Sequence, residues 1–139
     1  MASVNTFINF PGNCEEAFDF YKQVFETEYV GGIIRLGEAA PEAAQNMIAH
    51  IALPTIGGHI LNGADAPKEM GFDLVVGGNI YLMLEPDDRT STDRLFDRLS
   101  KGGQIVQPLE VQPWGSYYGI CVDKYSTKWV LNYPMSVAS

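Results

Sequence analysis

The side chains best suited to metal binding or proton transfer are the two histidines, His50 and His59. They lie on consecutive expected strands joined by a short turn. Neighbouring side chains of a strand point to opposite faces, so a shift of one residue in the pairing decides whether the two imidazoles share a face. The favoured interpretation is one histidine in a pocket and one at the surface. A metal site in which both histidines are helped by Glu85 or Asp65 is a weaker hypothesis.

The two cysteines offer limited chemistry. Cys14 falls in the first turn of an expected helix, a position that lowers the pKa of a thiol. A nucleophile also needs a base, and none lies near Cys14 in the sequence. Cys121 falls in the middle of an expected strand and is interpreted as a buried apolar residue. Two cysteines are too few for a structural zinc site or a disulfide framework, so free thiols are expected.

Aromatic residues are concentrated late in the chain, at Trp114, Tyr117, Tyr118 and Trp129. Such side chains on a sheet can line an apolar cavity, and they can equally serve as ordinary core or dimer packing. Trp114 directly precedes an expected strand, which favours a position at the lip of a pocket. Trp129 alternates with Val130, so one of the two faces the helix layer and the other faces the cavity.

Composition limits the possible classes of protein. A chain of 139 residues with 46% hydrophobic residues fits one domain with a substantial core. No apolar run is long enough to span a membrane. The net charge of −8 repels phosphates, so nucleic-acid binding is not expected. The start of the chain shows no signal peptide, which predicts a cytoplasmic location.

The first half of the chain is expected to contain a strand, a helix and three further strands. The helix begins at a capping-box pattern, Asn13 followed by Glu16, and its apolar residues recur at helical spacing. The elements are expected at 4–10, 13–26, 27–36, 47–53 and 59–63, with a loop or short helical turn at 37–46.

The second half repeats this order after a glycine- and aspartate-rich linker at 64–78. A second capping-box pattern, Thr90 to Asp93, precedes a helix that ends at Gly102 and Gly103. Strands are expected at 79–85, 104–111, 117–123 and 128–133.

The repeat predicts the fold class. Each half has the order β-α-β-β-β, so the sequence indicates an α+β protein of two βαβββ modules that form curved mixed sheets. The whole chain, 1–139, is expected to be one domain, with module 1 at about 1–66 and module 2 at about 76–139.

Three segments of the chain resemble a known family. They are FPGNCEEAFDFYKQVF at 10–25, PWGSYYG at 113–119, and DKY with KWVLN at 123–125 and 128–132. These motifs are similar to those of PhnB-like proteins, a branch of the glyoxalase/bleomycin resistance/extradiol dioxygenase (vicinal oxygen chelate) superfamily. The resemblance implies paired modules that each curl a small sheet around a cavity, and a homodimer. One label of this family mentions demethylubiquinone methylation, but the sequence shows no glycine-rich loop for a methyl donor.

The resemblance also implies four metal-ligand positions, held in superfamily enzymes by His, Gln or Glu. In this chain they fall on Thr6, on Val130, near Asn62, and near Asn79 or Ile80. Neutral amides and aliphatic side chains make a poor divalent site. The usual ligand set is therefore expected to be lost, and no cofactor is expected. If Val130 takes the direction of the former ligand, Trp129 lies in the core.

The sequence thus predicts a protein that binds a small molecule in a pocket between the curved sheets of a homodimer. The expected pocket residues are His50, Asn62, Trp114, Tyr117 and Tyr118. A metal-dependent lyase or dioxygenase, with a non-standard site at His50 and Glu85, is one alternative. A scaffold protein without a small ligand is the other. The identity of the ligand, and whether modules are exchanged in the dimer, are left open.

Overall fold

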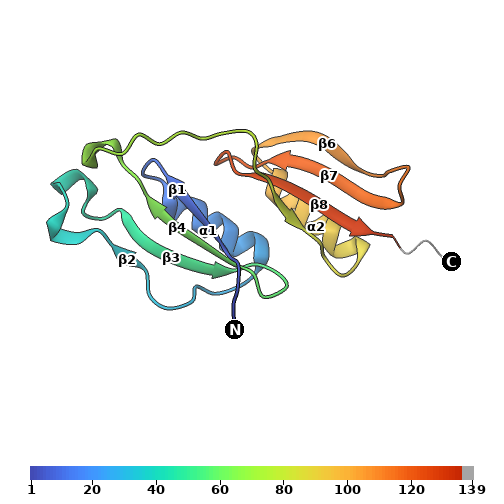
Figure 1. The fold of residues 1–139 in the computed structure, drawn as a ribbon, viewed down its shortest axis with the longest axis horizontal. Helices are drawn as coiled ribbons and strands as arrows, with labels where there is room; N and C mark the ends of the chain where they lie inside the picture. Colours follow the sequence, from blue (N-terminus) through green and yellow to red (C-terminus); the bar gives the residue numbers. More distant parts are fainter. Residues whose placement is uncertain (136–139) are drawn as a thin grey trace. The chain divides into compact units, whose positions relative to one another are not determined.

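A computed structural model describes residues 1–135 of the chain, which divides into two compact units, 1–75 and 76–139. Each unit contains a four-stranded sheet and one long helix (Figure 1). The predicted order β-α-β-β-β is confirmed in both units, and so is the α+β fold class.

The first unit pairs its strands in the order β1-β4-β3-β2. The strands β1 and β4 run parallel, whereas the other pairs are antiparallel. Short 3-10 turns lie at Gly37–Ala39, Glu42–Ala44 and Lys68–Met70. The elements are β1 (Thr6–Phe10), α1 (Cys14–Phe25), β2 (Ile34–Arg35), β3 (Ile48–Pro54) and β4 (Ile60–Asp65).

The second unit has the same topology, with the order β5-β8-β7-β6 and a single parallel pair, β5 with β8, among the residues described. Its elements are β5 (Leu82–Leu84), α2 (Arg89–Ser100), β6 (Gln104–Val111), β7 (Ser116–Val122) and β8 (Lys128–Pro134). In both units the last strand lies between the first and the third, so residues far apart in sequence become neighbours.

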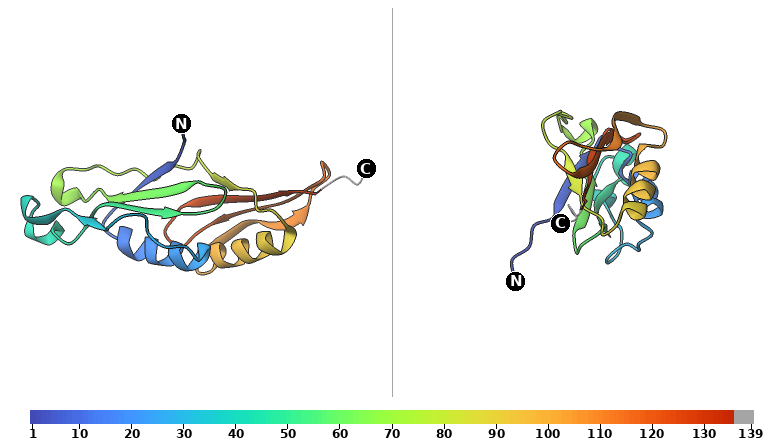
Figure 2. Two further views of the ribbon diagram at one scale, coloured as in Figure 1. Left: turned by 90° about the horizontal axis from the view of Figure 1, so that it is seen from below. Right: turned by 90° about the vertical axis from the view of Figure 1, so that its right-hand side faces the viewer.

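Each helix covers one face of its own sheet (Figure 2). The apolar side chains of α1 recur every three or four residues and form one buried stripe, which includes Phe18 and Tyr21. Gly63 on β4 allows this close approach, because a Cβ there would lie 2.4 Å from the ring of Phe18. In α2, Leu95, Phe96 and Leu99 are buried in the same way. Within residues 1–135, no helix is long and apolar enough to cross a membrane.

The predicted capping box of α1 is wrong. Asn13 occupies the N-cap position, but its side chain makes no capping hydrogen bond. The cap comes from Asp65 at the end of β4, whose Oδ1 accepts a hydrogen bond from the Cys14 amide at 2.9 Å. Parallel pairing of Phe10 with Asp65 brings that carboxylate to the helix. A residue about fifty positions away therefore replaces the local cap.

The predicted capping box of α2 is also wrong. The N-cap residue is Asp88, whose carboxylate accepts from the Ser91 amide at 2.7 Å, and Thr90 lies inside the first turn. Hydrogen bonding by the Ser91 amide, and then by the Ser91 side chain, lowers the pKa of Asp88. Aspartate is a strong N-cap residue because its carboxylate also opposes the positive end of the helix dipole.

Two predicted strands are shorter in the structure. Within 27–36 only Ile34–Arg35 forms a strand, β2, although the Val30 amide also donates to the Ala52 carbonyl of β3; within 79–85 only Leu82–Leu84 forms β5. Positive φ at Gly31 accompanies a bend before β2. β-rich composition favours an extended backbone, but a strand also needs continuous pairing with a neighbour, and these segments have it over only short stretches.

Candidate functional site on the open sheet faces

The candidate site lies on the face of each sheet that is turned away from its helix, which we call the open face. In the first unit the strand register places Phe7 beside Asn62, and Ala52 on the other side of Asn62. Phe7 is 55% exposed, whereas Leu61, the neighbour of Asn62 on the helix face, is fully buried. The alternation along β4 therefore separates a buried helix face from an open face that carries an amide.

His50 joins Asn62 on the open face of the first unit. The Nδ2 of Asn62 donates to the Thr6 carbonyl at 3.3 Å, so its Oδ1 is the atom that faces Nε2 of His50, at 3.0 Å. With Oδ1 as the acceptor, Nε2 of His50 is the donor of this bond, and a neutral ring would present Nδ1 as an acceptor. The ring of Phe7 stacks on His50 with centroids 6.3 Å apart. The arrangement places a hydrogen-bonded histidine beside an exposed aromatic ring.

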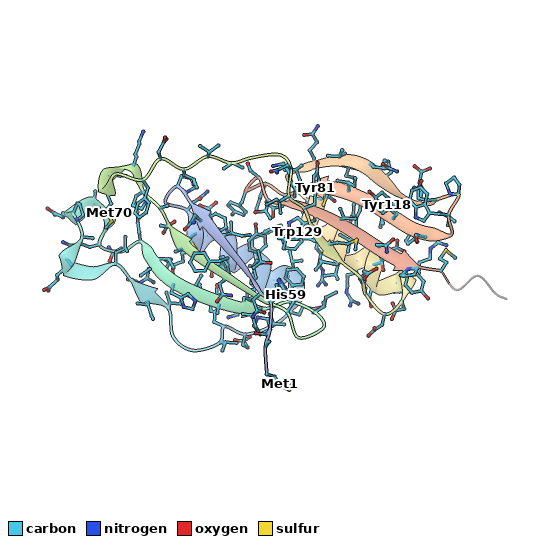
Figure 3. The ribbon with its side chains drawn as sticks, viewed as in Figure 1. Met1, His59, Met70, Tyr81, Tyr118 and Trp129 are labelled. Atoms are coloured by element: carbon cyan, nitrogen blue, oxygen red, sulfur yellow. The ribbon has the colours of Figure 1, made fainter. Side chains whose placement is uncertain are left out.

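His59 lies away from this group. Its Nε2 is 2.8 Å from the Thr6 hydroxyl and its Nδ1 is 2.8 Å from the Thr55 hydroxyl. Thr6 pairs with the buried Leu61, which places this cluster on the helix face. Burial lowers the pKa of His59, because charging the ring there costs solvation. The hydrogen-bond partners of His59, which Figure 3 labels, therefore differ from those of His50, and the two histidines lie on opposite faces of the sheet.

The open face of the second unit carries a second polar and aromatic group. Tyr118 pairs with Asn132 across β7 and β8. The Nδ2 of Asn132 donates to the Glu85 carboxylate at 2.9 Å. Trp114 packs edge to face on Tyr118 with centroids 5.7 Å apart and is itself 64% exposed. Met83 on the adjacent β5 is 57% exposed.

The neighbouring Tyr117 points to the opposite face, toward α2. It is 7% exposed, its hydroxyl hydrogen-bonds the Asp93 carboxylate, and the guanidinium of Arg89 lies 4.1 Å from its ring centroid. Burial and the bond to Asp93 raise the pKa of Tyr117. The structure therefore brings Trp114 and Tyr118 together and places Tyr117 apart from them.

Trp129 is a core residue, as expected if Val130 points away from the helix. Trp129, which Figure 3 labels, lies on β8 and is fully buried. Its Nε1 donates to the Asp123 carboxylate at 2.8 Å. Trp129 also pairs with Cys121, which is on the same buried face. Hydrogen bonding of the indole N–H allows so large a ring to be buried without an unsatisfied donor.

The cysteines are buried rather than reactive. The expectation of a lowered pKa at Cys14 is wrong, because burial, Asp65 and Glu15 all raise it. The position at a helix start is outweighed since the thiol is fully buried. Cys121 is fully buried as predicted, and burial with the nearby Asp123 raises its pKa to about 12.

The donor set does not fit the four-ligand metal site of superfamily enzymes. Thr6 faces the helix side and contacts His59, while Val130 is aliphatic. Both oxygens of Asp65 accept backbone hydrogen bonds, from Cys14 and Ile48. Among residues 1–135 no three His, Cys, Asp or Glu side chains gather as metal ligands do. His50 and Glu85, the pair considered for a non-standard site, belong to different units.

Phe7 and Glu110 are open-face residues that were not among the predicted site residues. Phe7 could have been found from the alternation of β1, in which every second side chain faces the helix. Glu110 could not, because only the β6–β7 register shows that it lies directly beside Tyr118.

Solved structures share this fold. A Pseudomonas aeruginosa protein is 23% identical, with a TM-score of 0.85 over 98% of this chain and 100% of that one. A putative 3-demethylubiquinone-9 3-methyltransferase, PhnB protein, from Bacillus cereus is 22% identical, with a TM-score of 0.76 over 95% and 99%. A glyoxalase/bleomycin resistance protein/dioxygenase family enzyme from Burkholderia phytofirmans is 14% identical, with a TM-score of 0.65 over 95% and 100%.

At this level of identity the solved structures establish the fold, and sequence establishes the family. The family model described as 3-demethylubiquinone-9 3-methyltransferase matches residues 2–132. This match spans both βαβββ units and includes the three motifs noted in the sequence. The chain therefore belongs to the PhnB-like 3-demethylubiquinone-9 3-methyltransferase family and has the glyoxalase/bleomycin resistance fold.

Proposed function

We propose that this protein binds a small, largely apolar molecule on the open faces of its sheets, and that a second copy of the chain covers these faces in a homodimer. The observation that carries the proposal is the exposed aromatic group of the second unit, Trp114 on Tyr118, beside a hydrogen-bonded polar pair. Small-molecule sites typically combine an apolar lining with a few fixed polar groups.

The first unit supports the same function with a comparable arrangement. Phe7 supplies an exposed ring, and the Asn62–His50 pair supplies fixed polar groups. The Thr6 carbonyl holds the amide of Asn62, and the amide oxygen in turn holds the imidazole of His50. A polar pair that is satisfied within the protein can orient a ligand without rearranging first, which reduces the entropy lost on binding. The proposal requires neither a metal nor a methyl donor.

Trp114→Ala is expected to weaken ligand binding roughly tenfold, because it removes the most exposed aromatic surface of the open face. Thermal-shift screening of small aromatic compounds and antibiotics first identifies a ligand. A ligand at about 100 times its Kd is expected to raise Tm by roughly 5–10 °C. Titration of that ligand against both proteins then measures the change in Kd.

Phe72→Ala is the matched control for this experiment. Phe72 is 52% exposed but lies between β4 and β5, outside both sheets, so its removal is expected to leave the affinity unchanged. If no compound class raises Tm, or if both variants lose affinity equally, binding at the open face of the second unit is contradicted.

Light scattering after size exclusion at low micromolar concentration is expected to give about twice the chain mass of 15.3 kDa. Phe7, Met83 and Trp114 are exposed on the open faces, and proteins tend to cover apolar surface of this kind by association. Two-fold pairing of identical chains is the commonest way to do so. A mass near that of one chain would contradict the homodimer.

The alternative functions give different results in the same assays. A metal-dependent lyase or dioxygenase would purify, without a histidine tag, with stoichiometric metal and would lose stability in chelator. A scaffold without a ligand would show no thermal shift with any compound class.

A further inference from the structure

We infer that the ligand of the second unit is an organic cation with an alkyl or aromatic body, such as a quaternary ammonium compound. The inference rests on the proposed small-molecule function. The positive charge of the ligand would lie over Trp114 and Tyr118, between the carboxylates of Glu85 and Glu110.

The strand register aligns these groups in one row across the sheet. Glu85 directly follows β5 and bonds Asn132 on β8, Asn132 pairs with Tyr118 on β7, and Tyr118 pairs with Glu110 on β6. Residues directly opposite each other in neighbouring strands point to the same face. At about 4.8 Å between strands, Tyr118 has a carboxylate one strand away on one side and two strands away on the other.

Neither carboxylate is neutralised by a cation within the described part of the chain. The ion pairs of Lys22 with Glu28 and of Arg35 with Glu15 both lie in the first unit and involve neither carboxylate. On the open face itself, Lys128 lies four residues before Asn132, roughly 13 Å along the strand. Its ammonium donates to the carbonyls of Gly77 and Ser126 instead.

The aromatic pair Trp114 and Tyr118 also favours a positively charged ligand. The faces of Trp and Tyr rings carry partial negative charge and attract ammonium groups, with Trp the stronger of the two. The edge-to-face packing of Trp114 on Tyr118, with an interplanar angle of 75°, leaves ring surface available in two orientations. A cation with an apolar body is therefore attracted by the rings and by the carboxylates together, whereas an anion of the same shape is repelled by both.

The experiment compares three probes of nearly identical shape: choline, the neutral 3,3-dimethylbutan-1-ol and the anionic 3,3-dimethylbutanoate. Tryptophan fluorescence reports binding, because Trp114 is exposed while Trp129 is fully buried. Choline is expected to bind about tenfold more tightly than the alcohol, and the acid most weakly. Lowering ionic strength from about 0.1 M to about 0.01 M lengthens the Debye length from about 10 Å to about 30 Å, which should strengthen binding of choline only.

Glu85→Gln and Glu110→Gln are each expected to weaken choline binding by slightly less than about twofold and leave the alcohol unaffected. Glutamine at position 85 keeps an oxygen that accepts from Asn132, so the change removes charge but not the hydrogen bond. The double variant should retain about a threefold preference for choline, which comes from the rings. Asp97→Asn, on the exposed side of α2, makes the same change in charge and should have no effect.

The outcomes separate this inference from the proposed function. Equal binding of choline and the alcohol, or a preference that survives the double variant in full, would overturn the cation site and leave small-molecule binding standing. Failure of all three probes, together with failure of every compound in the thermal-shift screen, would overturn both.

Discussion

Asp123→Ala is expected to destabilise the second unit by roughly 3–5 kcal/mol, one of the two largest effects of a single substitution that we foresee. Asp123 is 3% exposed, and its carboxylate accepts hydrogen bonds from the amides of Tyr125 and Thr127 and from Nε1 of Trp129. Without it, the indole N–H of a fully buried ring has lost its acceptor, and each buried donor without a partner costs about 1–3 kcal/mol. Urea unfolding followed by circular dichroism measures the loss.

Asp123→Asn tests whether both oxygens matter. Oδ1 accepts from the two backbone amides and Oδ2 accepts from Trp129, so an amide can keep one set of bonds but must turn an N–H₂ toward the other. We expect a loss between those of wild type and the alanine variant. Asp87→Ala, at an exposed position before α2, should change stability by less than about 0.5 kcal/mol. A loss at Asp123 no greater than that at Asp87 would show that the carboxylate does not hold Trp129.

Asp65→Ala is expected to destabilise the first unit by roughly 2–4 kcal/mol. Its Oδ1 accepts from the Cys14 amide at the start of α1, and its Oδ2 accepts from the Ile48 amide at the start of β3 at 2.8 Å. Loss of a helix cap costs about 1 kcal/mol, and the buried strand amide adds about 1–3 kcal/mol when it is left without an acceptor. Urea unfolding again provides the measurement.

Asn13→Ala is the informative comparison for Asp65. Asn13 holds the N-cap position by sequence, yet its side chain makes no capping bond and its Oδ1 is buried without a partner. Removing it should cost much less than removing Asp65. The opposite order would mean that the local residue caps α1 in solution, against the structure.

The sequence by itself determined the order of the elements. Both helices and the long strands β3, β4, β6, β7 and β8 lie within a few residues of their predicted positions. These features depend on near neighbours in the chain: a 3.6-residue apolar period, glycine at Gly102 with φ of 78°, and alternation along strands. The family motifs are also contiguous segments, so they could be recognised without the fold.

The tertiary structure decided what lies beside what. The predicted caps at Asn13 and Thr90 failed because carboxylates outside the predicted patterns took their place, at Asp65 and Asp88. Likewise, alternation predicts that Tyr117 and Tyr118 point to opposite faces of the sheet. Only the packing of α2 on Tyr117 shows that Tyr118 is the one on the open face.

Strand register and strand order decide two further features: the separation of His50 from His59, and the alignment of side chains from Glu85 to Glu110 across the second sheet. The strand orders place β4 beside β1 and β8 beside β5. Such contacts join residues tens of positions apart. Local sequence propensity does not determine these contacts. They follow from the strand pairing that buries the helix face of the whole sheet, and that pairing is non-local.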